Sequence, residues 1–446
     1  MTELNYENYA KDLSYIWQNT PKNKKRKHYF LTDQLGDEYL IKKYELYLKY
    51  RKTKDIDLKF ELDYIKDFYK FKIYLYLIIC SYYNRITDFY VYYKEDYLIK
   101  DQNKVLIEYN KQINTMIRRL KQGLKLNITI PHSICVKFMN QIKNYNSKIY
   151  NFIKNNYLNK CRKTFGICHL PNGKEIYKTL LKHTLQGIKK TPKEIHNLGL
   201  SLLTNFNYTV KREFYTSRES LYKDCNEIAL YIYDHIIDKY FHYKPDKPFT
   251  LNKLPLELEN SSAMAHYDPN VDIVYINLSI YQQLTKATLY PLLMHECLHQ
   301  YHHRFMWFLK LKHYQMFGYD NLLLIEGFAH YMETYCEYYD DNNDFSTLRK
   351  LRLVVDTGIN YYGWSYEKSF NFMIKYLPQK RNDIITELDR YVCNPTQSLC
   401  YVLGKIEIIK MRDKFLKEKK GSIKDFHYKL LVKGTPSFLT LNEYIF

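Results

Sequence analysis

The sequence predicts a mainly α-helical protein with one small β-sheet. Long stretches repeat their apolar residues every three to four positions, which is the helical period. Residues that break helices are few, with 13 glycines and 12 prolines among 446 residues. Strand-like composition is concentrated in one stretch, residues 262–277. A hydrophobic content of 46% indicates that the chain buries a large core.

Residues 1–160 are predicted to be a helical N-terminal region. Segments rich in Lys, Tyr, Leu and Ile show helical periodicity, as at 37–52 and 105–124. The most apolar run, at 71–83, is too short and too closely flanked by charges to cross a bilayer, so it predicts a buried helix. We therefore expect no membrane-spanning segment. The role considered for this region is a lid or cleft wall.

Residues 161–446 are predicted to form a second region that carries the chemistry. It opens with a loop at 166–173 that contains Gly and Pro. Further on, Thr191 is suited to be a helix N-cap, because Pro192 follows at the first helical position and Glu194 stands three residues after the cap. This pattern predicts a helix that begins at residue 192.

The strand-like stretch at 262–277 contains its own turn. Pro269 and Asn270 favour a turn, and the β-branched and aromatic residues at 272–277 predict a strand after it. We expect the exposed edge of the 271–277 strand to align a peptide by strand addition. From residue 286 onward helical patterns dominate to the end of the chain.

The chain is basic, with a formal net charge of +20. A basic surface can bind nucleic acid, but the lysines are scattered, and the only dense run lies at 21–30. Nucleic acid is therefore not an expected partner. The sequence leaves the oligomeric state open.

The predicted location is the cytoplasm. Nine cysteines without paired spacing fit reduced thiols better than a disulfide framework. The first residues also lack the basic start and apolar core of a secretory signal. Whether the host is a cell or a large virus is left open.

The clearest chemical motif lies in the apolar stretch at 290–305. Its order is His295-Glu296-x-x-His299. On a helix, residues four apart lie on the same face, so the two imidazoles can share one metal ion. Glu296, beside them, can take a proton from a metal-bound water. By itself the motif also arises by chance.

A third ligand is needed, and Glu326 is the candidate. A hydrolytic zinc site holds its ion by three protein ligands and keeps one position open. Glu326 follows the apolar run at 322–325, where a carboxylate is costly to bury unless a cation compensates its charge. The small neighbours Gly327 and Ala329 allow this helix to approach the His295/His299 helix closely. An ordinary solvent-facing glutamate is the alternative.

Several motifs around and beyond this site resemble a known family. The EGFAHYME segment at 326–333 and four further segments are similar, in the same order, to the bacterial metallopeptidase-like family labelled domain of unknown function eight-eight-five. The further segments are 170–200, 351–373, 389–412 and 425–441. The resemblance implies a mainly helical zincin fold and a zinc-dependent peptidase with one zinc ion per chain. It also implies short peptides as substrates.

The chain departs from the family at two places. The family usually has a Pro-Gly pair between the glutamate and the following histidines, whereas this chain has a regular HExxH. That makes His299 the expected second ligand, although His302, seven residues after His295, and its neighbour His303 stay open as alternatives. The family also typically has a histidine at the position of Asn360.

Four further residues are candidates for supporting roles. Asp356 is expected to orient a zinc-bound imidazole, and Arg352, one turn earlier, to hold Asp356 or bind a substrate carboxylate. Alternatively, Arg352 and Asp356 form an ordinary salt bridge between successive turns of one helix. Tyr401 resembles the tyrosine that donates a hydrogen bond to the oxyanion in helical zinc peptidases. Glu333 is a further candidate, as a carboxylate that accepts a hydrogen bond from a metal-binding side chain.

Together these features predict a zinc-dependent peptidase in which Glu296 is the general base. The alternative is a catalytically inactive metal-binding protein of the same fold that serves as a structural or interaction module. The two departures from the family pattern favour this alternative. The natural substrate, and the choice between exopeptidase and endopeptidase action, do not follow from the sequence.

Overall fold

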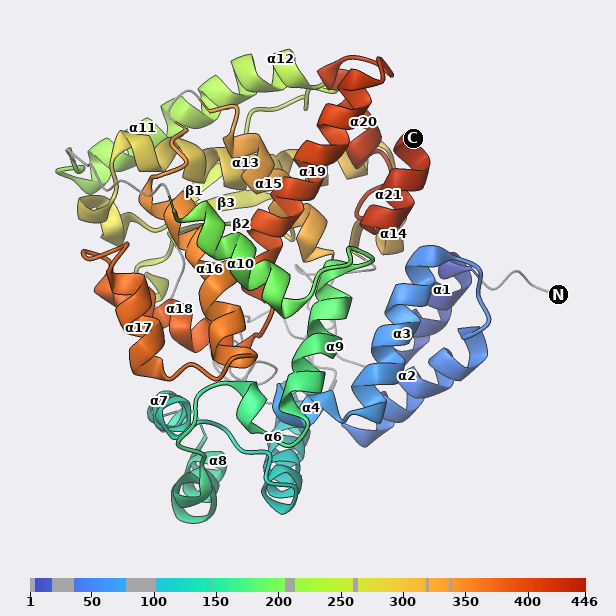
Figure 1. The fold of residues 1–446 in the computed structure, drawn as a ribbon, viewed down its shortest axis with the longest axis vertical. Coiled ribbons are helices and arrows are strands. Elements are labelled where there is room, and N and C mark those ends of the chain that lie inside the picture. Colours follow the sequence, from blue (N-terminus) through green and yellow to red (C-terminus); the bar gives the residue numbers. More distant parts are fainter. Residues whose placement is uncertain are drawn as a thin grey trace. The chain divides into compact units, whose positions relative to one another are not determined.

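The fold is mainly helical and includes one three-stranded sheet (Figure 1). The computed structural model describes residues 5–17, 36–77, 102–144, 146–204, 213–259, 264–317, 321–336 and 339–446. The predicted fold class, mainly α with a small sheet, is therefore confirmed. The basic run at 21–30 and part of the apolar run at 71–83 lie outside the described residues.

The chain divides into two compact units. The first contains residues 1–183, 190–196 and 354–398, and the second contains 184–189, 197–353 and 399–446. The loop at 166–173 lies inside the first unit. The division thus differs from the expected one near residue 160, and a lid role for residues 1–160 stays a prediction.

The first unit is built from helices. They are α1 (Tyr6–Trp17), α2 (Asp37–Tyr50), α3 (Ile56–Lys70), α4 (Ile73–Tyr76), α6 (Gln102–Lys125), α7 (His132–Ile142), α8 (Ser147–Phe152), α17 (Tyr366–Ile374) and α18 (Arg381–Cys393), with most of α9 (Gly173–Leu185), the start of α10 (Pro192–Leu202) and the end of α16 (Asp344–Asn360). Helices α2 and α6 confirm the periodicity seen in the sequence. In α4, Ile73 and Leu75 are buried, as expected for the apolar run.

The predicted start of α10 is confirmed. Thr191 Oγ1 accepts from the Glu194 N–H at 3.2 Å, and Glu194 Oε2 accepts from the Thr191 N–H at 2.7 Å. Each of these bonds satisfies a backbone donor that the helix itself leaves free at its N-terminus.

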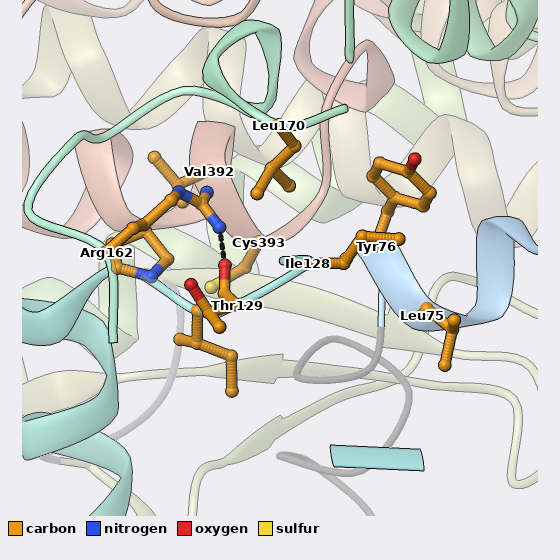
Figure 2. Close-up of a pocket in the computed structure, with 10 residues that line it drawn as sticks. Leu75, Tyr76, Ile128, Thr129, Arg162, Leu170, Val392 and Cys393 are labelled. Carbon is orange, nitrogen blue, oxygen red and sulfur yellow. Dashed lines mark hydrogen bonds between the residues drawn. The ribbon is translucent and has the colours of Figure 1, made fainter. Parts of the chain in front are cut away.

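A small cavity lies within the first unit (Figure 2). Apolar side chains such as Leu75 and Leu170 line it, and the Arg162 guanidinium donates to the Thr129 carbonyl oxygen at its wall. Its free volume is about 20 Å³, which is space for about one water molecule. A peptide cannot enter it, so the cavity carries no substrate site.

The second unit combines helices with the sheet. Its elements are the rest of α10, α11 (Arg218–Tyr231), α12 (Asp238–Tyr240), β1 (Leu251–Lys253), β2 (Ala265–Asp268), β3 (Ile273–Ile276), α13 (Lys286–Phe308), α14 (His313–Phe317), α15 (Leu322–Glu333), the start of α16, α19 (Cys400–Lys417), α20 (Ile423–Leu431) and α21 (Phe438–Ile445). The helical pattern expected from residue 286 onward is confirmed.

The sheet has the strand order β1-β3-β2. Strand β3 confirms the strand predicted at 272–277, and it pairs in parallel with β1 and antiparallel with β2. Because β3 is the central strand, both of its edges are already hydrogen-bonded. The expectation that a substrate lies along the 271–277 edge is therefore wrong, and the outer edges of the sheet belong to β1 and β2.

Helix α13 begins at a reciprocal cap and is buried along most of its length. Thr285 is the N-cap, and its side chain and that of Thr288 each accept from the other residue's backbone N–H. Leu289, Leu293 and Leu298 are fully buried. Burial on several sides holds the helix in the interior of the second unit, so polar side chains on it must find partners there.

Helices α15 and α19 pack against each other, and α15 also packs against α13. A Cβ atom placed on Gly327 would lie 2.5 Å from the Gly404 Cα atom. Only glycine permits two helix backbones to come so close. We expected Gly327 to let the Glu326 helix approach the His295/His299 helix, but Gly327 instead lies at the close contact with α19.

Candidate metal centre

Three of the predicted residues converge in the second unit. His295 and His299 project from consecutive turns of α13, and Glu326 projects from α15. Their three ligand atoms all lie within 4.8 Å of one another. Glu326 Oε2 is 3.0 Å from His295 Nε2 and 3.6 Å from His299 Nε2.

These separations fit a tetrahedral zinc ion. Two ligand atoms that each lie about 2.05 Å from a tetrahedral ion are about 3.3 Å apart. The side chains are also largely buried, with exposed fractions of 5% for His295, 13% for His299 and 15% for Glu326. One buried carboxylate and two imidazoles form the donor set of many zinc sites, so the residues present fit this ion.

The residues of the cluster shift one another's pKa values. Burial alone would raise the pKa of Glu326, but its hydrogen bonds to His295 and His299 hold it well below the usual range. Burial would lower the pKa of His295, but its hydrogen bonds to Glu326 and Glu333 outweigh that effect and raise it to about 9. The buried imidazoles and the buried carboxylate thus stabilise each other's charged forms.

The two alternative histidines lie elsewhere. His302 Nε2 is 3.3 Å from the Gly434 carbonyl oxygen. His303 Nδ1 is 2.6 Å from the Tyr267 hydroxyl oxygen. The structure thus brings His299, and neither of these two, to the other candidate ligands.

Glu296 is held by the outer strand of the sheet. Its Oε2 atom accepts from the Tyr267 backbone N–H at 2.9 Å. Tyr267 lies opposite Val274 in the β2–β3 pairing, and its N–H points away from β3 to Glu296. The carboxylate, which is 8% exposed, is therefore oriented by the edge of β2 and keeps a second oxygen for other contacts.

Glu333 contacts a candidate ligand directly. Its Oε1 atom lies 2.8 Å from His295 Nδ1, so the imidazole can donate there and present Nε2 to a metal. Its other oxygen accepts from Arg349. The structure therefore gives Glu333 the imidazole contact that the sequence had suggested for Asp356.

Tyr401 and Arg352 lie on one side of this cluster. The Tyr401 ring is stacked beside the His295 ring, with 5.9 Å between centroids and 21° between planes. The Arg352 guanidinium lies 4.6 Å from the centre of the Tyr401 ring. Both residues are thus near the candidate ligands, while an oxyanion role for Tyr401 and a substrate contact for Arg352 stay predictions.

Asp356 belongs to the first unit and has different partners. Its carboxyl group accepts from the Tyr177 hydroxyl at 2.7 Å, the Thr396 N–H at 3.1 Å and the Ser398 hydroxyl at 3.2 Å. It is fully buried, and burial raises its pKa to about 7 although these hydrogen bonds oppose the shift. These contacts give it a structural role in the first unit.

Asn360 has a comparable role. Its Oδ1 atom accepts from the Ile167 N–H at 3.3 Å, and its Nδ2 atom donates to the Tyr391 carbonyl oxygen at 2.9 Å. It is fully buried. Asn360 therefore ties two backbone segments together.

The sequence analysis did not identify two residues that contact side chains of the candidate site, Tyr267 and Arg349. The Tyr267 contribution comes from its backbone, which leaves no trace in the sequence. Arg349 had a visible signal, because it lies one helical turn before Arg352 and therefore shares its face. The i, i+3 spacing of Arg349 and Arg352 was sufficient to make Arg349 a candidate site residue.

Comparisons with known proteins add a family and two solved structures. A family model described as "Bacterial protein of unknown function (DUF885)" matches residues 205–445. No curated protein matches the chain.

The two solved structures share the fold at low sequence identity. One is described as a "putative lipoprotein" from Colwellia psychrerythraea, with a TM-score of 0.61 and 19% identity over 77% of this chain and 76% of that one. The other is described as a "putative lipoprotein of unknown function" from Shewanella oneidensis, with a TM-score of 0.61 and 15% identity over 98% of this chain and 97% of that one.

These neighbours contradict the predicted location. Lipoproteins are held at a membrane by an attached lipid, outside the cytoplasm in bacteria, and both neighbours carry that description. The expectation of a cytoplasmic protein is therefore wrong by this comparison; it rested on cysteine spacing and on the first residues of the chain. Within the described ranges, no helix is both long and apolar enough to cross a bilayer.

Proposed function

The chain belongs to the DUF885 family of bacterial proteins, and from that premise we propose that it is a zinc-dependent peptidase with a helical zincin fold. The observation that carries the proposal is the convergence of His295, His299 and Glu326 at separations suited to tetrahedral zinc. Glu296, on the same helix, supplies the carboxylate that such a hydrolase needs. His295, His299 and Glu326 would hold the ion.

Each residue then has a defined task. When bound, zinc supplies a Lewis acid that polarises a peptide carbonyl and lowers the pKa of a water molecule to near neutral. Glu296 would accept a proton from the attacking water and later deliver it to the leaving amine. Tyr267 holds one oxygen of Glu296 in place, so the other is available for the proton. Tyr401 donates to the oxyanion.

The outer edge of β2 is the place for the substrate backbone. The Tyr267 N–H on this edge is taken by Glu296, so a peptide that extends the sheet beside it would pass the general base. Strand addition fixes a peptide through backbone hydrogen bonds, which are independent of its side chains. We therefore expect broad side-chain tolerance on short peptides.

The second candidate is a zinc-binding protein of this fold without hydrolytic activity. Asn360 favours it, because the family typically has histidine at that position and this asparagine holds backbone groups instead. Such a protein would keep the three ligands and act as a structural or interaction module.

One experiment separates the candidates. The full chain is purified, its zinc content is measured by mass spectrometry, and a library of short peptides is digested and analysed for cleavage. A peptidase contains one zinc per chain and cleaves peptides, and removal of zinc by a chelator abolishes cleavage. Stoichiometric zinc without cleavage favours the inactive module, and a chain that binds no zinc refutes both.

The control is Glu296→Gln. Glutamine keeps the shape and the hydrogen bond to Tyr267 but cannot take a proton, so we expect unchanged zinc content and cleavage slower by about 10²- to 10⁴-fold. A Gln variant as active as the wild type would remove Glu296 from the role of base without affecting the zinc assignment.

A further inference from the structure

Arg349 on α16 is the basic side chain bonded directly to the carboxylate behind the candidate metal ligand His295. Its Nη1 atom donates to Glu333 Oε2, and its Nη2 atom lies 3.5 Å from His295 Nδ1. Arg349 is 8% exposed and Glu333 is fully buried. The three side chains thus form a chain of contacts from α16 through α15 to α13.

The two oxygens of Glu333 are used by different partners. Oε1 faces His295 Nδ1, and Oε2 is bonded to Arg349. With both oxygens fixed, the carboxylate cannot rotate, so the imidazole donor meets an acceptor of constant direction. A metal-bound imidazole is held in this way when its other ring nitrogen has a fixed acceptor.

Arg349 also compensates the negative charge of the buried Glu333 carboxylate. An imidazole that binds a metal through Nε2 is neutral, so it offers Glu333 a hydrogen bond but no countercharge. A buried carboxylate without a countercharge is unfavourable. Arg349 supplies that charge, and its guanidinium lies 5.6 Å from the centre of the Tyr401 ring, which stacks on His295.

We infer that Arg349 is a positioning residue of the metal site, acting on His295 through Glu333 and not by touching the metal or the substrate. The inference rests on the proposed zinc site and deepens it. It predicts that Arg349 sets zinc affinity only while Glu333 is a carboxylate.

The test is a double-mutant cycle with zinc affinity as its readout. Zinc dissociation constants are measured by competition with a chelator for the wild type, Arg349→Met, Glu333→Gln and the double variant. Arg349→Met alone should weaken zinc binding by about 10- to 100-fold, the range found for residues that orient metal ligands. In the Glu333→Gln background, where no buried charge needs compensation, the same change should have less than about a threefold effect.

Lys350→Met is the matched control. Lys350 is the next residue of α16, is 6% exposed and pairs with Asp341 at 2.5 Å, so it is a buried cation of the same helix with a different partner. Its loss should leave the zinc dissociation constant within about twofold of wild type. Arg349→Lys, which keeps the charge but loses the planar fork, should fall between wild type and Arg349→Met.

The outcomes are separable. Zinc binding by Arg349→Met equal to that of the wild type, or an equal loss with and without Glu333, overturns the role of Arg349 and leaves the proposed function intact. A wild type that binds no zinc overturns the proposed function itself. If Arg349→Met does not fold, a double variant that folds and binds zinc like Glu333→Gln supports the role, and one that fails as well overturns it.

Discussion

Single residues in this protein have their chemistry set by what the fold buries beside them. Glu326 and Asp356 are both carboxylates in largely buried positions, yet their pKa values move in opposite directions. Glu326 faces two imidazoles, which hold its pKa low. Asp356 faces hydroxyl and amide donors, which do not offset burial, so its pKa rises to about 7. The first suits a cation site, and the second does not.

Removal of the Glu326 charge should abolish the response to zinc. Because Glu326→Gln keeps the shape but loses the anionic ligand, we expect zinc affinity to fall by at least about 100-fold. Thermal unfolding with and without zinc measures this, since a ligand that binds only the folded state raises the melting temperature. Glu418→Gln, at a position whose side chain is 41% exposed, is the control and should respond to zinc like the wild type. An equal zinc-dependent shift in both variants would contradict the assignment of Glu326.

Asp356 should give the first unit an unusual dependence on pH. Its folded pKa of about 7 lies above the ordinary value of 3.8, so the stability that it contributes is fully present below about pH 4 and is lost as the pH rises to about 7. The expected loss is at most about 1.4 kcal/mol per pH unit.

The measurement is a comparison of Asp356→Asn with the wild type in denaturant unfolding from pH 5 to pH 8. Since asparagine does not titrate, the free energy of unfolding of the variant relative to the wild type should increase as the pH rises. A difference that is constant over this range would show that Asp356 keeps an ordinary pKa. Absolute stability is not the readout, because the amide group changes the hydrogen bonds to Thr396 and Ser398.

At the level of elements, local patterns in the sequence were sufficient for helices and for the spacing on one helix. The His295-Glu296-x-x-His299 motif predicted a shared face because α13 is regular, and the buried position of Glu326 was visible in the apolar run before it. The order of the strands was not visible. Strand β1 has only three residues, Leu251–Lys253, with no strand-like composition, and its parallel pairing with β3 is what makes β3 central.

The contact between α15 and α19 should affect the metal site through Glu326. Gly327→Ala would place a Cβ atom 2.5 Å from the Gly404 Cα atom, so the helices must move apart, at a cost of about 1–3 kcal/mol. Because Glu326 is the preceding residue on α15, we expect weaker zinc binding as well. Calorimetry of unfolding and chelator competition measure the two effects.

Gly358→Ala is a control with a similar steric conflict in the other unit. A Cβ atom there would lie 2.7 Å from the Trp364 ring, so stability should fall while zinc affinity stays unchanged. If both variants left zinc affinity unchanged, the position of Glu326 would not depend on the α15–α19 contact.

For the whole molecule, four described histidines of the second unit that are buried away from the candidate metal ligands have a common consequence. Burial lowers the pKa of His302 to about 3 and the pKa values of His303 and His427 to about 4, and it holds the pKa of His330 well below the usual range. The unfolded chain binds protons at these residues near pH 6.5. Between about pH 4 and pH 6.5, the unfolded state therefore binds more protons than the folded state.

The second unit should consequently lose stability steeply when the pH falls from about 6.5 towards 4. Each histidine contributes up to about 1.4 kcal/mol per pH unit, so the four together give at most about 5 kcal/mol per pH unit. His295 does not add to this slope, because its pKa is raised to about 9 and its contribution is fully present below pH 6.5. The prediction is tested by denaturant unfolding at pH 7.5, 6.0 and 5.0 in the presence of a chelator.

His427→Gln tests the origin of the slope. His427 is fully buried, with Nε2 at 2.9 Å from the Tyr331 hydroxyl and Nδ1 at 2.8 Å from the Tyr240 carbonyl oxygen. Glutamine can keep polar contacts there without titrating, so we expect the slope between pH 6.5 and 5 to fall by about a quarter. His242→Gln, at a position whose side chain is 48% exposed, should leave the slope as it is. If instead the wild type were equally stable at pH 7.5 and 5.0, these histidines would be protonated in the folded state, and the buried core of the second unit would admit charge that its contacts do not compensate.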